Sequence, residues 1–527
     1  LLGSPYPAEK LREAWDRFLF LAFHDVITGT AIDQAYDEVR EIFQSLGGTL
    51  RGLLTASLNY LASHITIDGR AFVVFNPNSF ETRGWVEAEA EFPIEERLRG
   101  FSLEDADCEL IEEDRDDLTG WLRRARVGFV ARVPPLGYRV YQIQPVAATP
   151  PTRRVVHGRT FVENAYLRLE ANPLTGTYRI LDTQGAELVS EIKLELENEV
   201  GSVYTHRDIT KDLAGLVATE GDLSPNKPVF EITDLKVEEG PVAKRITITE
   251  HVYGSFWPYR LREHFGVEFR NQHLMVIEKE ASLYEGVPWV EFKLRLKSDF
   301  PHVKVRMRFA TGIPQGRCFA GTAFGVIERI MEPRDFPMEG WVDYGNEERG
   351  VAVFTRGIRG YQVSGENICI TLLRSVHLIS HGDKGPITPV PDALELGREY
   401  EFSFAVYPHR GSWVAGKVWK EALSFVNPLT QVYIESQNQE KRALVSEPSF
   451  LSLPENVIVS CLRQSQDGTC VILRCYETCG VATKLRLNFS RKPKEILASN
   501  ILEDKEEPVG EEIELRPFQI ATFKLRF

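Results

Sequence analysis

Residues 58–75, with the sequence LNYLASHITIDGRAFVVF, contain the point at which the hydrophobic pattern of the chain changes. Before residue 65, apolar residues recur every three or four positions, which is the period of an amphipathic α-helix. After it, the chain turns at residues 66–69 and enters a short apolar strand at residues 71–75. The change of period predicts a helical N-terminal region followed by a long β region.

The N-terminal region reads as three helices. Residues 8–23 carry apolar side chains on one helical face, and a second helix is signalled by Thr30 with Asp33 three positions on, a capping arrangement. Gly47-Gly48 is expected to end this helix, and the helical pattern resumes over residues 49–64. We therefore expect a short bundle of three antiparallel helices over residues 1–65.

The remainder of the chain has the pattern of antiparallel β structure. Strands of five to ten residues, separated by Gly, Pro, Asn or Asp, continue to the end without intervening helices. The best linker covers residues 146–154, and a second covers residues 425–452. We expect a mainly β protein in which the bundle is followed by a small β-sandwich domain (66–150), a large β-sandwich domain (155–425) and a C-terminal β-sandwich domain (426–527).

Charge and hydropathy exclude several classes of partner. The 76 acidic residues outnumber the 62 basic ones and give a formal charge of −14, the wrong sign for binding phosphates. No apolar stretch approaches the roughly 18 residues that a membrane span needs, and the N-terminal residues lack the basic region followed by an apolar core that marks a secretory signal. We expect neither nucleic acid nor membrane as a partner, and a cytoplasmic protein.

The seven cysteines favour a reducing compartment, because their number is odd and their usage ordinary. Cys461, Cys470, Cys475 and Cys479 cluster, but they lack the paired C-x-x-C knuckles of a zinc ribbon. The first two suit opposite arms of a hairpin around Asp467-Gly468. We interpret all four as small, buried apolar side chains.

The stretch from Phe23 to Thr30, FHDVITGT, carries the most informative polar pair. His24 and Asp25 are adjacent, so on a helix they point in different directions: the imidazole can bind a metal while the carboxylate accepts a hydrogen bond from a hydroxyl. A histidine at a helix end is more often only a capping group. His377 and His381 are spaced as ligands on a helix, but Ser380, Gly382 and Gly385 predict a loop without metal.

Motifs along the whole chain resemble glycoside hydrolase family 38, the zinc-dependent α-mannosidases. The motifs are FHDVITGTAIDQAYDEV from Phe23, VVFNPNSFETRGWV from Val73, VENAYLRLEANPLTGTYRI from Val162, WVDYGNEERGVAV from Trp341, TLLRS from Thr371 and AVYPHRGSW from Ala405. The resemblance implies a galactose-mutarotase-like large sandwich. It also implies that an N-terminal catalytic barrel, which holds the nucleophile, lies upstream of Leu1.

The resemblance also implies a site shared between that barrel and this chain. His24 would be one of four ligands of a zinc ion, Asp25 would bind hydroxyls of the mannose, and Tyr204 is the candidate for a tyrosine that reaches the same sugar. The implied reaction is retaining hydrolysis of α-mannosides, with no catalytic residue in this chain, so the chain alone is expected to be inactive. The implied partners are an α-mannoside and the barrel, and a homo-oligomer is left open.

Two other classes of function remain open from the sequence. The chain can act as a carbohydrate-binding module, because aromatic residues such as Trp257 and Trp341 suit stacking on sugars. Alternatively, it is a scaffold that stabilises a barrel partner through an apolar face near Trp15 and Phe18.

Overall fold

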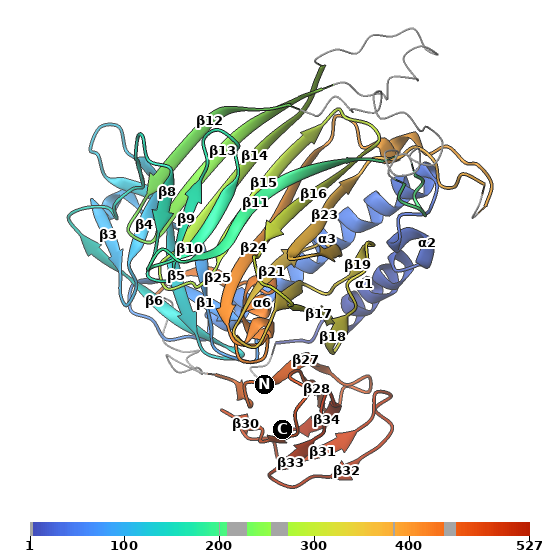
Figure 1. Cartoon of the computed structure of the whole chain (residues 1–527). Coiled ribbons are helices and arrows are strands. Elements are labelled where there is room, and N and C mark those ends of the chain that lie inside the picture. Colours follow the sequence, from blue (N-terminus) through green and yellow to red (C-terminus); the bar gives the residue numbers. More distant parts are fainter. Residues whose placement is uncertain (1–3, 200, 208–228, 255–271, 383–384, 437–448) are drawn as a thin grey trace, which may run out of the picture.

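The computed structural model describes residues 4–199, 201–207, 229–254, 272–382, 385–436 and 449–527. In Figure 1 the helical region lies beside a large β sandwich, a small β domain lies at one end of that sandwich, and the C-terminal strands form a separate body below. The mainly β fold class predicted from the sequence, with helices first and several antiparallel sandwiches after them, is confirmed.

The helical region contains α1 (Ala8–Leu21), the single-turn α2 (His24–Ile27) and α3 (Asp33–Ala62). The prediction that Gly47-Gly48 ends a helix is wrong, because α3 runs through both glycines and neither adopts the left-handed backbone that ends helices. Each glycine costs about 1 kcal/mol relative to alanine in a helix, and packing at both ends of α3 compensates. Thr30 does not cap α3, which begins after Ile32.

The two long helices share a thin core. Ala14 and Leu21 of α1 pack against Leu46 of α3, with Val39 and Ile42 beside them. Many large apolar side chains of the same helices are exposed: Trp15, Phe18, Leu19, Phe20, Phe23, Ile27, Phe43, Leu50 and Leu54. We call these nine residues the apolar face of the helices.

The small β domain consists of two sheets that share one core. The first has the order β25 (Thr430–Glu435), β1 (Arg70–Asn76), β6 (Gly137–Val146) and β3 (Gly100–Leu103). The second has the order β2 (Thr82–Glu91), β5 (Leu122–Val133) and β4 (Cys108–Arg115), and η1 (Ile94–Glu96) is a 3-10 turn between β2 and β3.

The large sandwich packs an eight-stranded sheet on a ten-stranded sheet. The eight-stranded sheet has the order β19 (Phe336–Pro337), β22 (Gly360–Ser364), β23 (Asn367–Arg374), β16 (Val303–Ala310), β11 (Glu187–Asn198), β10 (Tyr178–Asp182), β9 (Leu167–Ala171) and β8 (Phe161–Glu163). The ten-stranded sheet has the order β18 (Gly325–Arg329), β17 (Arg317–Thr322), β20 (Trp341–Gly345), β21 (Arg349–Arg356), β24 (Glu399–Arg410), β15 (Val290–Ser298), β14 (Gln272–Tyr284), β13 (Ala243–Gly254), β12 (Val229–Glu239) and β7 (Arg154–Val155).

The C-terminal body has a core of its own. Its five-stranded sheet has the order β27 (Val457–Gln464), β28 (Val471–Glu477), β34 (Ile520–Arg526), β31 (Glu495–Ser499) and β32 (Glu507–Pro508). Two short pairs complete it, β29 (Thr483–Leu485) with β33 (Ile513–Leu515) and β26 (Leu451–Ser452) with β30 (Asn488–Phe489).

One strand departs from the domain boundaries expected from the sequence. β25 falls within residues 426–527, assigned to the C-terminal sandwich, yet it pairs along its whole length with β1 of the small domain. The chain reaches it through α6 (Val418–Val426), which packs its buried face on the ten-stranded sheet and on residues of the small domain. Sequence pattern identifies a strand, but it does not say which sheet the strand joins.

An ion pair lies inside the large sandwich. Nζ of Lys279 on β14 lies 2.6 Å from Oε1 of Glu250 on β13 and donates to the carbonyl of Gly176 at 2.6 Å. Both side chains are at most 3% exposed. Burial lowers the pKa of Lys279 and raises the pKa of Glu250, and their mutual attraction opposes both shifts. Gly176 is required here, because a Cβ would lie 1.6 Å from the Glu250 carboxylate.

We expect Lys279→Met to destabilise the large sandwich by about 3–5 kcal/mol, because it leaves the Glu250 carboxylate buried and unpaired. The double variant Glu250→Leu/Lys279→Met should recover most of this loss. Urea unfolding of the variants measures both effects, and Lys293→Met, which breaks an exposed pair with Glu401, is the matched control with an expected loss below about 1 kcal/mol. A double variant as unstable as Lys279→Met would contradict the interpretation.

Candidate functional site

The His24-Asp25 pair lies at an elbow between the two long helices. α2 carries both residues, and the chain reverses after it at Gly29, whose φ of +77° favours glycine. The N–H of Gly29 donates to the Val26 carbonyl at 3.2 Å, and the N–H of Thr30 donates to the Asp25 carbonyl at 2.9 Å. This closed turn fixes the backbone from which both side chains project.

The His24 side chain is 78% exposed, and the ring of Phe23 lies 4.3 Å from it, centroid to centroid. Its Nε2 lies 3.5 Å from Oδ2 of Asp25. Within the described residues, no hydrogen bond occupies either ring nitrogen of His24. The imidazole is therefore open to an external ligand and does not cap a helix end.

Asp25 is held by its neighbours through one of its carboxylate oxygens. The Thr30 hydroxyl donates to Oδ1 at 3.1 Å, and the side chain of Asp25 remains 42% exposed. The Tyr36 hydroxyl lies 3.2 Å from the Asp25 carbonyl and 3.3 Å from the Val26 carbonyl, so α3 braces the elbow. Burial raises the pKa of Tyr36, which keeps this hydroxyl a neutral donor. The other oxygen of Asp25 can accept a bond from a ligand hydroxyl.

The start of α3 is attached to the large sandwich. Asp392 lies in η3 (Pro391–Leu394), its N–H donates to the Asp33 carboxylate at 3.2 Å, and its carboxylate lies 3.3 Å from the Arg40 guanidinium. In Figure 1, α3 runs along the sandwich to the side where α2 lies. These contacts fix the position of the elbow relative to the loops of the large sandwich.

Tyr204 lies in one of those loops, after β11. Its side chain is 47% exposed, and in the described part of the chain neither a hydrogen bond nor a ring contact joins it to His24 or Asp25. The structure therefore places Tyr204 on an open loop without bringing it into contact with the elbow. Glu199 and Arg374, which hold this loop, were not identified from the sequence, although Arg374 lies within the TLLRS motif.

The other candidate metal ligands are His377, His381 and the four clustered cysteines. In the described ranges, no three His, Cys, Asp or Glu side chains group to hold a metal ion. His377 lies in a loop as predicted and packs edge-on against His302. The four clustered cysteines are free thiols, and Cys461 lies in the β27–β28 hairpin as expected.

Of the two aromatic residues proposed for sugar stacking, Trp341 is described by the structure, and its burial does not support that role. Trp341 is only 5% exposed and packs in the core beside Trp413, so its ring faces are not available to a sugar. The expectation that it is exposed is wrong, because its position on β20 faces α6 and the core between the domains. Trp257 lies outside the described residues.

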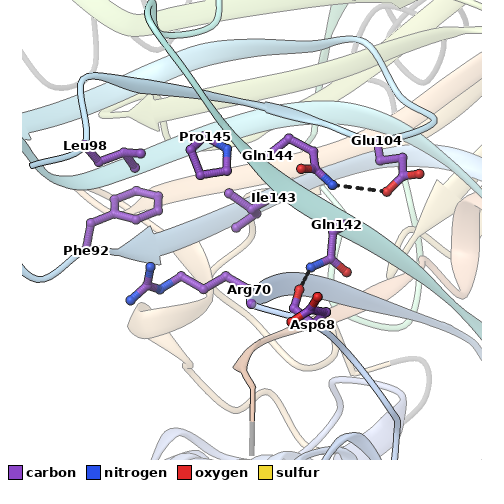
Figure 2. A pocket seen from close by; sticks show the side chains of 10 residues that line it. Asp68, Arg70, Phe92, Leu98, Glu104, Gln142, Ile143, Gln144 and Pro145 are labelled. Atoms are coloured by element: carbon purple, nitrogen blue, oxygen red, sulfur yellow. Dashed lines mark hydrogen bonds between the residues drawn. The ribbon is translucent and has the colours of Figure 1, made fainter. Parts of the chain in front are cut away.

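A hollow of about 450 Å³ lies on the small β domain, and Figure 2 shows the side chains that line it. Its apolar end is formed by Phe92, Leu98, Ile143 and Pro145. At its polar end, the Gln142 amide donates to the Asp68 carbonyl and the Gln144 amide lies 3.3 Å from the Glu104 carboxylate. Because these polar groups are bonded to one another, the hollow contains no group prepared for catalysis.

No helix of the described chain combines the length and apolar character that crossing a bilayer requires.

Three family models match the chain in order. They are the alpha mannosidase middle domain (residues 1–61), the glycosyl hydrolases family 38 C-terminal domain (162–378) and the glycosyl hydrolases family 38 C-terminal beta sandwich domain (456–523). The elbow with His24 and Asp25 lies in the first match, and Tyr204 lies in the second.

Relatives in sequence and in structure agree with these models. Alpha-mannosidase G of Dictyostelium discoideum is 23% identical over 99% of this chain and 49% of its own length. Alpha-mannosidase 2C1 of Homo sapiens is 21% identical over 99% of this chain and 46% of its length. The crystal structure of an alpha-mannosidase from Enterococcus faecalis superposes over the whole chain and 64% of its own length, with a TM-score of 0.78 and 17% identity, and so shares the fold.

The chain spans about half the length of the curated relatives that it matches. Their similarity begins at the helices and continues through the sandwiches, in the order in which the three family models match. The chain therefore belongs to glycoside hydrolase family 38, of which it contains the α-mannosidase middle domain and the C-terminal β domains.

Proposed function

We propose that this chain forms one wall of the active site of a retaining α-mannosidase, whose other wall is an N-terminal catalytic barrel. In this proposal His24 is one zinc ligand, and Asp25 and Tyr204 bind the mannose at the cleavage site. The observation that carries the proposal is the elbow: the exposed imidazole of His24 lies 3.5 Å from the half-exposed carboxylate of Asp25, within the match to the middle domain.

In this chain, His24 fits the role of one ligand in a zinc site whose other ligands would come from the barrel. Neutral imidazole is a common zinc ligand, and the ring of His24 is oriented by Phe23 and by the fixed turn at Gly29. Catalytic zinc normally takes three protein ligands, so a single histidine needs further ligands from the barrel. When bound, the metal would hold hydroxyls of the sugar and favour distortion of its ring.

The chain's own residues would bind and orient the sugar. Asp25 keeps one oxygen on Thr30 and can accept a sugar hydroxyl on the other, while the Tyr204 hydroxyl can donate to the same sugar from the opposite loop. The nucleophile and the general acid would both come from the barrel, as the pair of carboxylates of a retaining glycosidase. The elbow would then position the sugar and would take no part in proton transfer.

The apolar face of the helices supports the proposal that a second protein body packs against this chain. Its nine large side chains are between 41% and 70% exposed, and solitary proteins rarely leave large apolar patches in water. A groove of about 510 Å³ between α1 and α3, lined by Phe20 and Ile42, lies on the same helices. A barrel packed on this face would bury it and bring its own ligands to His24.

We expect the polypeptide of residues 1–527 alone to retain no stoichiometric zinc and to release no mannose from an aryl α-mannoside. The reason is that one imidazole cannot complete a zinc site. Metal analysis after gel filtration and a chromogenic assay in zinc-containing buffer measure both properties. Robust hydrolysis by this polypeptide would refute the division of the site between two bodies.

In the whole protein, including its catalytic barrel, we expect His24→Ala to lower both zinc content and kcat/KM, the latter by more than about a hundredfold. Asp25→Asn should leave zinc content unchanged and lower kcat/KM by about ten- to a hundredfold, because it weakens only the bond to the sugar. His157→Ala, which changes an exposed histidine in the turn after β7, is the control. Full zinc content in His24→Ala would rule out the imidazole as a ligand.

A further inference from the structure

Glu199 is a charged side chain that is completely buried at the base of the Tyr204 loop. It follows β11, and its carboxylate accepts four hydrogen bonds. Oε1 accepts from the backbone N–H groups of Gly201 at 2.9 Å and Arg207 at 3.2 Å. Oε2 lies 2.5 Å from Nδ1 of His206 and accepts from Nε of Arg374 at 2.8 Å. Such a set of donors compensates for the removal of a carboxylate from water.

These bonds fold residues 201–207 into a closed loop. The N–H of Ser202 donates to the Thr205 carbonyl at 2.8 Å, and the N–H of Thr205 donates back to the Ser202 carbonyl at 3.2 Å. Tyr204 lies inside this turn, at the exposed tip of the loop. The base of the loop is therefore fixed by a buried charge, while its tip presents a tyrosine to solvent.

Arg374 joins this loop to the end of β23. Besides Glu199, its guanidinium donates to the carbonyls of Ser202 at 2.9 Å and Val203 at 3.3 Å. The N–H of Val203 donates to the Leu378 carbonyl at 2.9 Å, so both sides of the loop are attached to the same segment. A planar guanidinium that reaches three acceptors leaves the loop little freedom to shift.

The same strand end also holds the turn that contacts α3. The Ser375 hydroxyl donates to the Leu394 carbonyl at 2.7 Å, and the N–H of Val376 donates to the Ala393 carbonyl at 3.1 Å. Both acceptors belong to η3, whose Asp392 contacts Asp33 and Arg40 of α3. One continuous set of hydrogen bonds and ion pairs thus runs from the Tyr204 loop to α3, the helix that follows the elbow.

Glu199 is suited to a permanent anchor and not to proton transfer. Burial alone would raise the pKa of Glu199, but the hydrogen bonds from His206 and Arg374 outweigh burial and hold this pKa at about 2. The carboxylate is therefore ionised at neutral pH, and it has no exposed surface through which to reach a substrate.

We propose that Glu199 is a positioning residue of the mannoside site: together with Arg374 it fixes the loop 201–207 so that Tyr204 is held where a sugar can meet it. This inference rests on the proposed function of Tyr204. It adds a buried carboxylate, remote from the elbow, whose effect on the reaction passes through the tyrosine.

The test is a double-mutant cycle on the whole protein with its catalytic barrel, using an aryl α-mannoside. We expect Glu199→Gln to lower kcat/KM by about ten- to a hundredfold, because the neutral amide places an NH₂ among donors and the loop moves. Tyr204→Phe should also lower kcat/KM. In the Tyr204→Phe background, Glu199→Gln should cost less than about threefold, since its target is already lost.

Glu195→Gln is the matched control. Glu195 lies on the same strand and pairs with Arg308 and Lys193, away from the loop, so kcat/KM should stay within twofold of the natural protein. His206→Ala removes one donor from a partly exposed position and should show a smaller loss with the same dependence on Tyr204. If Glu199→Gln does not fold, the kcat/KM of His206→Ala, with and without Tyr204→Phe, tests the inference instead.

Two results would overturn the inference and leave the function of Tyr204 intact: an unchanged kcat/KM in Glu199→Gln and His206→Ala, or losses that multiply fully in the double variants. An unchanged kcat/KM in Tyr204→Phe would remove the sugar contact itself and the inference with it. Zinc content should remain that of the natural protein in every variant, which separates these effects from loss of the metal.

Discussion

The attachment of α3 at both of its ends is the constraint on which the candidate site depends. At its C-terminal end, Leu58, Leu61 and Ala62 pack on the sheet that contains β1 and β25. At its N-terminal end, Asp33 and Arg40 contact Asp392 of the large sandwich. Thirty residues of helix measure about 45 Å, so α3 connects these two attachments as one continuous helix. The elbow at its start has a defined position although α2 itself is a single turn.

In the candidate site, exposed side chains lie on segments that internal hydrogen bonds hold in place. His24 and Tyr204 are exposed at the tips of their segments, whereas Glu199 beneath the loop has no exposed surface. Rigid support beneath an accessible side chain is the arrangement that binding and catalysis require, because a group that must meet a substrate should not have to be ordered first. In both segments a backbone turn and buried or half-buried hydrogen bonds supply this order.

The proposed division of the active site between two bodies follows from the same reasoning. One imidazole and one carboxylate suffice to take part in a site and are too few to complete one. The apolar face of the helices lies beside them and gives a second body a surface on which to pack. A site formed between two bodies depends on how each is held, which gives the contacts of α3 and the Tyr204 loop their importance. The sandwiches would then supply a stable base for this surface.

The sequence by itself determined the mainly β class, the helical N-terminal region, most strands and the adjacent polar pair at residues 24 and 25, because these follow from local periodicity and turn chemistry. The expectation that no helix follows the N-terminal region is wrong, because the nine residues of α6 are too few for helical and strand periodicity to be told apart. It could not determine that α3 continues through Gly47-Gly48, since the packing at both helix ends compensates for the glycines. Nor could it assign β25 to the first sheet or place Trp341 in a core, because pairing and burial depend on segments hundreds of residues away. The ring of donors around Glu199 was decided only by the tertiary structure, which brings Arg374 to a carboxylate 175 positions before it. Such long-range contacts leave no periodic trace in the sequence.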